Sequence, residues 1–177
     1  MTAFASAILR SGVSARRGLG FMAAAFAALL ALAACQTVPP PPAPTVVNVS
    51  LAADATINPE LSGLPAPVLV RVYELTSASE FQQADFFQLL ERDQETLGAA
   101  MVGREELTLS PGGSDSMTLN FGPESRYVGV MVAFRDIDNA LWRAVTSVPQ
   151  NATSAVAVSL SGLTVQIGGA GIVAPAS

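Results

Sequence analysis

The chain has 177 residues, half of them hydrophobic, with a single cysteine and no histidine. Without histidine it lacks the commonest general base and metal ligand, which excludes serine–histidine and cysteine–histidine catalysis and zinc sites built on histidine. Its nine basic residues, all arginines, are outnumbered by 14 acidic residues, which gives a net charge of −5. This balance argues against nucleic acid and against anionic lipid head groups as electrostatic partners.

Residues 1–34 are predicted to be a signal peptide. Arg10, Arg16 and Arg17 precede a run from Leu19 to Ala34 that contains no charged residue. The run is at the upper end for the apolar region of a signal peptide and short for a membrane span, which needs about 20 apolar residues. We therefore expect this segment to be removed from the mature protein.

The tetrapeptide Leu32-Ala33-Ala34-Cys35 resembles the lipobox of bacterial lipoproteins. In that class the cysteine thiol receives a diacylglyceryl group, the chain is cleaved before the cysteine, and the new amino group is acylated. A thiol is the best side-chain nucleophile near neutral pH, and Cys35 is the only one available. Lipidation of Cys35 is predicted in preference to an ordinary secretory signal that ends beside a cysteine. Several acyl chains hold a protein firmly on a membrane, whereas one binds only marginally.

The residue after the cysteine indicates which membrane carries the lipid. In the lipoproteins that this sequence resembles, Asp at that position tends to retain the protein in the inner membrane, and this chain has Gln36. We therefore expect an outer-membrane protein that faces the periplasm. No cofactor is expected beyond the diacylglycerol and the N-acyl chain on Cys35.

The mature chain is expected to begin with a tether at residues 35–44, which contains the sequence QTVPPPPAP. Consecutive prolines favour an extended conformation that rises about 3.1 Å per residue, so the tether can lift a domain by roughly 25–30 Å. All 14 acidic but only six basic residues follow residue 34, so the mature net charge is −8. The 143 remaining residues are enough for one domain with its own core.

Alternating hydrophobic residues predict two strands, at residues 46–51 and 68–75. The segment 54–67 between them is rich in Asn, Pro, Gly and Ser, and it is long for a hairpin connection, where 2–5 residues are usual. Long ordered loops in small domains often carry binding residues.

The hydrophobic spacing changes after the second strand and predicts a helix over residues 79–91, with a possible short turn up to Gly98. Ser79 and Gln82 have the spacing of a capping box at its start. The helix is rich in phenylalanine, which favours packing on a sheet over an exposed binding face.

The rest of the domain is predicted to be strands and turns. Turn signals separate six further candidate strands, at residues 105–109, 116–121, 127–135, 141–148, 154–160 and 163–167. Short strands with regular turn signals indicate a mainly β fold, a two-sheet β-sandwich of about eight strands over residues 45–167 with a helical insertion after the second strand. Residues 168–177 are expected to be a disordered tail.

No candidate catalytic or metal-binding motif in the sequence is complete. The segment 136–139, DIDN, begins like a calcium loop but lacks the glycine and glutamate that such a loop needs at its sixth and twelfth positions. A hairpin turn explains it better. Glu105 and Glu106 point to opposite faces of a strand. We therefore expect no enzyme, no metal site and no small-molecule substrate.

The strand PVLVRVYEL at residues 67–75 and the helix FQQADFFQL at residues 81–89 are the most specific segments of the chain. Together they resemble the TssJ (VasD) family of type VI secretion outer-membrane lipoproteins, whose pattern is P-V-x-V-R-V-Y-x-L followed by F-x-x-A-D-F-F-x-L. The features shared with this family occur in the same order and cover nearly all of residues 46–165.

The resemblance implies a transthyretin-like sandwich and a non-enzymatic structural role. In this family the lipoprotein binds the periplasmic part of the IcmF-like inner-membrane protein TssM and so ties the membrane complex to the outer membrane. The loop between the first two strands, here about residues 55–67, is the implicated contact. The predicted partner-binding residues are Ile57, Asn58, Pro59, Leu64 and Pro65.

Two other functions remain open on sequence grounds. A periplasmic ligand-binding module on a transthyretin-like sandwich would need a concave apolar pocket. A hydrolase is the least favoured, because the chain offers no plausible catalytic triad.

Overall fold

The computed structural model describes residues 40–172. The predicted signal peptide, the predicted lipidation site Cys35 and most of the predicted tether lie outside the described residues. Residues 40–44 are exposed and form neither helix nor strand, and the first strand begins at Thr45.

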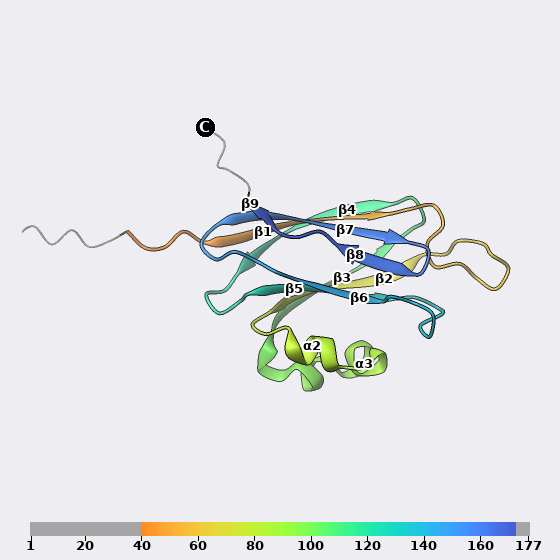
Figure 1. Cartoon of the computed structure of the whole chain (residues 1–177), viewed down its shortest axis with the longest axis horizontal. Coiled ribbons are helices and arrows are strands. Elements are labelled where there is room, and N and C mark those ends of the chain that lie inside the picture. The colour runs from red at the N-terminus through yellow and green to blue at the C-terminus, as the bar shows by residue number, and fades with distance from the viewer. Residues whose placement is uncertain (1–39, 173–177) are drawn as a thin grey trace, which may run out of the picture. The chain divides into compact units, whose positions relative to one another are not determined.

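The domain is a sandwich of two β-sheets with helices on one side (Figure 1). The first sheet, here sheet A, has the order β4-β1-β7-β8, and the short β9 also pairs with β7. Its strands are β1 (Thr45–Ala53), β4 (Ser114–Phe121), β7 (Thr153–Ser161), β8 (Thr164–Ile167) and β9 (Gly171–Ile172). The second sheet, here sheet B, has the order β3-β2-β5-β6. Its strands are β2 (Val68–Leu75), β3 (Met101–Leu109), β5 (Tyr127–Ala133) and β6 (Arg143–Ser147).

The predicted sandwich is confirmed, including the helical insertion after the second strand. All eight predicted strands are present, and β2 has the predicted bounds. Alternation along β1 buries Val47, Val49 and Leu51 between the sheets while Asn48 and Ser50 face outward. Hydrophobic burial between the two sheets is the main source of stability, because no disulfide is possible with one cysteine.

Strand β2 is buried on both faces, which explains its nearly continuous hydrophobic sequence. Val70 and Val72 belong to the core between the sheets. Tyr73 and Leu75 belong to a second core, in which sheet B packs against the helices. Gly129 on β5 makes room there, since a Cβ at this position would lie 2.9 Å from Leu75 and 3.2 Å from Phe81.

The single helix predicted at 79–91 is wrong. The structure has two helices, α2 (Ser79–Gln83) and α3 (Phe86–Leu97), followed by the 3₁₀ turn η1 (Gly98–Ala100). Ala84 is extended between them, and Asp85 and Gln88 form a reciprocal capping box that begins α3. Ser79 makes no cap for α2. The chain breaks at Ala84 because the Asp85 carboxylate satisfies a backbone N–H that would otherwise lack a partner at the start of α3.

The prediction of a disordered tail from residue 168 is wrong for its first five residues. Gly168 N–H donates to Ala157 C=O at 2.8 Å, and β9 pairs with Ser154 and Ala155 of β7. Sheet A therefore extends to Ile172, and residues 173–177 lie outside the described part.

Candidate functional site

Four loops lie at the end of the sandwich where β1 finishes and β2 begins (Figure 1). One of them, the β3–β4 loop (110–113), packs against the end of β1, where Gly112 N–H donates to Asp54 C=O at 2.9 Å. The other three meet one another. They are the β1–β2 loop (54–67), the β5–β6 loop (134–142) and the β7–β8 turn (162–163). Backbone hydrogen bonds join them: Asn58 N–H donates to Gly162 C=O at 2.8 Å, and Leu141 N–H donates to Leu163 C=O at 2.9 Å. This surface, here termed the loop end, lies opposite the end at which β1 starts.

Asn58 holds the loop end together and does not face outward. Its side-chain amide donates to Pro67 C=O at 2.8 Å, and its side-chain carbonyl accepts from Arg135 N–H at 2.8 Å. Its φ of +49° is a left-handed conformation that asparagine tolerates better than most residues. Asn58 is only 2% exposed, so the prediction that it contacts a partner is wrong.

Ile57 is also an internal residue. It is completely buried and belongs to the core between the two sheets. Its predicted role as a partner anchor is therefore wrong, and its side chain fixes the base of the β1–β2 loop instead.

The outer part of the same loop is exposed. Glu60 N–H donates to Leu64 C=O, Gly63 N–H donates to Glu60 C=O, and Gly63 has φ +82°, so residues 60–64 form a tight turn. Leu61 at its tip is fully exposed, Leu64 is 64% exposed, and Pro65 is exposed. Pro59 is half-buried. Pro59, Leu64 and Pro65 stay predicted partner contacts.

Sequence reasoning missed two exposed leucines at the loop end. Leu61 lies within the predicted loop, and Leu141 on the β5–β6 loop is 66% exposed. A leucine two residues before a turn glycine was the available signal for Leu61. Leu141 gave none, since it lies at the start of a segment predicted to be a strand.

A hollow separates the β1–β2 loop from the other two loops. It is lined by Pro59, Glu60, Leu61, Arg135, Asp136 and Leu163. Arg135 Nη2 lies 3.4 Å from Glu60 Oε1 across it. Both side chains are largely exposed, so this ion pair contributes little to stability. The arrangement presents apolar side chains rimmed by charges, as at a protein-binding surface.

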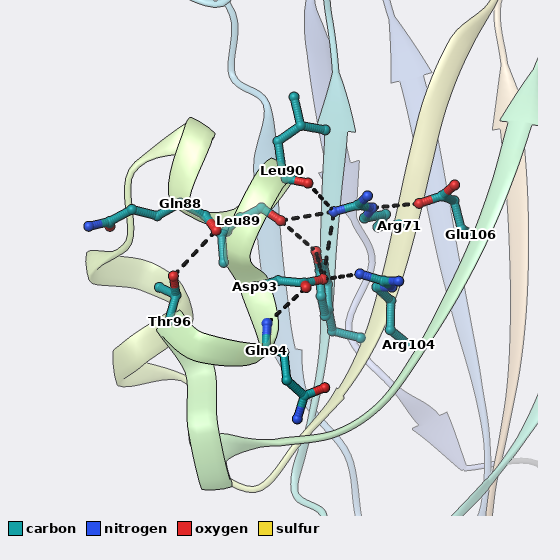
Figure 2. Close-up of polar contacts among 10 residues, drawn as sticks. Arg71, Gln88, Leu89, Leu90, Asp93, Gln94, Thr96, Arg104 and Glu106 are labelled. Atoms are coloured by element: carbon teal, nitrogen blue, oxygen red, sulfur yellow. Dashed lines mark hydrogen bonds and ion pairs between the residues drawn. The ribbon is translucent and has the colours of Figure 1, made fainter.

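A charged cluster lies beneath α3, on the face of sheet B that the helices cover (Figure 2). Asp93 forms ion pairs with Arg104 and with Arg71, the latter at 3.6 Å. Its other oxygen accepts from Gln94 N–H at 2.8 Å, and Tyr73 Oη lies 3.2 Å from the carboxylate. The carboxylate is thus fully satisfied by protein groups.

Arg71 connects the sheet to a break in α3. Its Nη1 donates to Leu89 C=O at 2.9 Å and Leu90 C=O at 2.8 Å, just before Arg92 leaves the helical conformation (Figure 2). Its Nε donates to Glu106 on β3 at 2.7 Å. The guanidinium thus supplies donors to carbonyls of α3 where the helical conformation is interrupted. The cluster therefore fastens α3 to sheet B and offers no free group for catalysis.

Burial raises the pKa of the Tyr73 hydroxyl to about 12. The folded state therefore favours the protonated tyrosine more than the unfolded state does, whose tyrosine pKa is about 10. This contribution to stability is fully present below pH 10 and is lost as the pH rises towards 12, by at most about 3 kcal/mol.

We expect Tyr73→Phe to weaken this alkaline loss. The free energy of unfolding, measured by urea denaturation at pH 8, 10 and 11.5, should fall less steeply above pH 10 in the variant than in the wild type. Parallel declines in the two proteins would show that Tyr73 does not carry the effect.

Metal and membrane features can be stated for residues 40–172. No group of three or more Asp or Glu side chains in this part of the chain is placed to hold a metal ion. Asp136 accepts from the Asn139 side-chain amide with both oxygens, as in a turn. No helix within the same residues is long and apolar enough to cross a membrane.

The fold and the site define a two-sheet β-sandwich with exposed leucines on the loops at one end. The chain belongs to the family described as "Type VI secretion lipoprotein, VasD, EvfM, TssJ, VC_A0113", whose model matches residues 45–163. The predicted family is therefore confirmed. A comparison with curated proteins gives no match.

Solved structures agree with this assignment. The T6SS lipoprotein TssJ1 from Pseudomonas aeruginosa is 34% identical, with a TM-score of 0.70 over 74% of this chain and 99% of that chain. Serratia marcescens Lip, a membrane-bound component of the type VI secretion system, has the same fold at 23% identity, with a TM-score of 0.66 over 71% of this chain and 96% of that one.

A third similar chain comes from the structure described as "T6SS protein TssM C-terminal domain (869-1107) from EAEC". It is 25% identical, with a TM-score of 0.57 over 68% of this chain and 98% of that chain.

Proposed function

We propose that this lipoprotein is a non-enzymatic anchor of a type VI secretion membrane complex. It is held in the outer membrane by lipid on Cys35, faces the periplasm, and binds the periplasmic domain of the IcmF-like inner-membrane protein TssM through its loop end. The observation that carries the proposal is the gathering of exposed Leu61, Leu64 and Leu141 at this end. Support also comes from the family and from the similar chain in the structure named after a TssM domain.

The direction of β1 favours this arrangement. The strand begins at Thr45, next to the tether, and runs to the loop end at Ala53. A nine-residue strand spans about 30 Å. The loop end is therefore at the opposite end of β1 from the segment that leads to Cys35.

Binding is tested by calorimetric titration of the mature chain without its lipidated first residue (residues 36–177) with the periplasmic domain of TssM. We expect a dissociation constant in the micromolar range or below, in keeping with a specific protein interface. Absence of binding at tens of micromolar would rule out the proposal.

The anchor is tested separately with Cys35→Ser. We expect this variant to lose membrane retention and secretion, because it cannot receive the diacylglyceryl group. Immunoblots of separated inner-membrane, outer-membrane and soluble periplasmic fractions provide the measurement. Recovery of the variant with the outer membrane at the wild-type level would contradict anchoring through Cys35.

A further inference from the structure

A second hollow lies on the other side of the β5–β6 loop, between this loop and the junction of α2 and α3. Phe86 and Phe87 contribute from the start of α3, and Ile137 and Trp142 from the β5–β6 loop. We refer to this hollow as the aromatic groove.

Packing of the helix on the sheet does not explain Phe87. Phe86 and Leu89 are the buried residues that hold the first half of α3 against sheet B. Phe87 projects from the same turn but remains 54% exposed. It lies beside Ile137 and Trp142, which are half-buried. The polar and charged residues that also line the hollow surround these apolar side chains: Gln83, Asp85, Arg92, Asp138 and Arg143. The hollow thus has an apolar centre and a polar rim, as a protein-binding surface has.

The aromatic groove is held rigid from within. The Phe86 ring makes edge-to-face contacts with Phe87 and Trp142, with centroids 5.3 Å apart in each pair. Arg143 lies over Trp142 at 4.7 Å and donates to the C=O groups of Phe81 and Ala84 at the end of α2. A partner side chain that enters such a site loses little free energy to ordering of the groove, because the rings are already fixed.

The position of the aromatic groove indicates what occupies it. The β5–β6 loop is the wall between the two hollows, with Arg135 and Asp136 lining the one at the loop end and Ile137 lining the aromatic groove. Leu141, exposed at the loop end, directly precedes Trp142. A protein bound over the three loops therefore reaches the aromatic groove without a break in the surface.

The size of the loop end also indicates that one partner covers both the loop end and the aromatic groove. In its three loops 14 residues are exposed, whereas a specific interface uses about 20–30 residues on each side. The aromatic groove adds seven lining residues that lie outside these loops, so together they reach the size that a specific interface requires.

We propose that the aromatic groove receives an apolar side chain of the same periplasmic partner, so that the partner contacts the β5–β6 loop from both sides. This inference rests on the proposed function and extends the binding surface from the loops to the helical insertion. Phe87 is its central contact, because it combines exposure with a fixed aromatic surface.

The test compares Phe87→Ser with Val102→Ser in titrations of the mature chain with the periplasmic domain of TssM. Val102 is a matched control, since it is 51% exposed and lies on β3, the edge strand of sheet B farthest from β6. We expect Phe87→Ser to weaken binding at least about tenfold, as for other interface aromatics, and Val102→Ser to leave it unchanged. Phe87→Leu should restore most of the affinity, and circular dichroism should show that all variants are folded.

A second measurement needs no substitution. Trp142 is the only tryptophan of the chain, so labelling with 5-fluorotryptophan places a single fluorine resonance in the aromatic groove. Addition of unlabelled TssM domain should shift or broaden this resonance.

Each outcome separates the two proposals. If the wild type binds, Phe87→Ser binds within twofold of it, and the fluorine resonance stays unchanged, the aromatic groove proposal is overturned and the proposed function stands. If the wild type itself fails to bind, the proposed function fails and this inference fails with it.

Discussion

Replacement of Asp93 with alanine is expected to lower the free energy of unfolding by about 2–4 kcal/mol, which would make it among the most damaging single changes in the domain. The substitution leaves the guanidinium of Arg71, whose side chain is 12% exposed, without its buried carboxylate. Removing one partner of a buried ion pair typically costs about 3–5 kcal/mol. We expect a smaller loss of stability here because Arg71 still donates hydrogen bonds to Glu106 and to the carbonyls of Leu89 and Leu90.

The loss of stability is measured by urea denaturation of two variants, Asp93→Ala and the control Glu106→Gln. Glu106 also pairs with Arg71, at 2.7 Å, but its side chain is 44% exposed, so its loss should cost less than about 1 kcal/mol. Equal destabilisation by the two substitutions would mean that burial of Asp93 does not decide its contribution.

Replacement of Leu61 with aspartate is expected to weaken binding to the TssM periplasmic domain by about 30-fold or more, with no loss of stability. Leu61 is fully exposed at the tip of the 60–64 turn, so the folded domain does not depend on its side chain. In a complex, the new carboxylate would be placed in an apolar contact without a partner, which costs about 2 kcal/mol or more.

Val102→Asp is the matched control for this substitution. It introduces the same charge at a similarly apolar, exposed position, near the start of β3 and away from the loop end. Titration calorimetry should show wild-type affinity for Val102→Asp. If Leu61→Asp also binds with wild-type affinity, the loop end is not the contact surface.

Much of the fold could be predicted because its signals are local. The alternation along β1 and the two-sided hydrophobic sequence of β2 follow directly from which faces are buried. The helical insertion was visible from its change of hydrophobic spacing. Its division into α2 and α3 was missed, because two capping patterns competed and only the one formed by Asp85 and Gln88 is used.

The candidate site could be predicted as a segment but not residue by residue. Ile57, Asn58 and Leu61 lie within five residues of each other, yet the first two are buried and the third is fully exposed. What separates them is the meeting of loops far apart in the chain, such as the bond from Arg135 N–H to Asn58. The local sequence pattern around residues 57–61 does not indicate these contacts between distant loops.

The charged cluster beneath α3 shows the same limit. Arg71 and Tyr73 share one face of β2, and the strand register places them opposite Glu106 and Arg104 on β3. The motif was visible in the sequence, but this pairing and the burial of Asp93 against it depend on tertiary structure.

The most direct test of the central claim is photo-crosslinking in cells that produce the whole secretion system. A photoreactive amino acid at position 61 should form a covalent adduct with TssM that is recovered with the outer membrane, and the same residue at position 102 should not. Crosslinking to TssM from position 102 but not from position 61 would contradict a partner contact at the loop end.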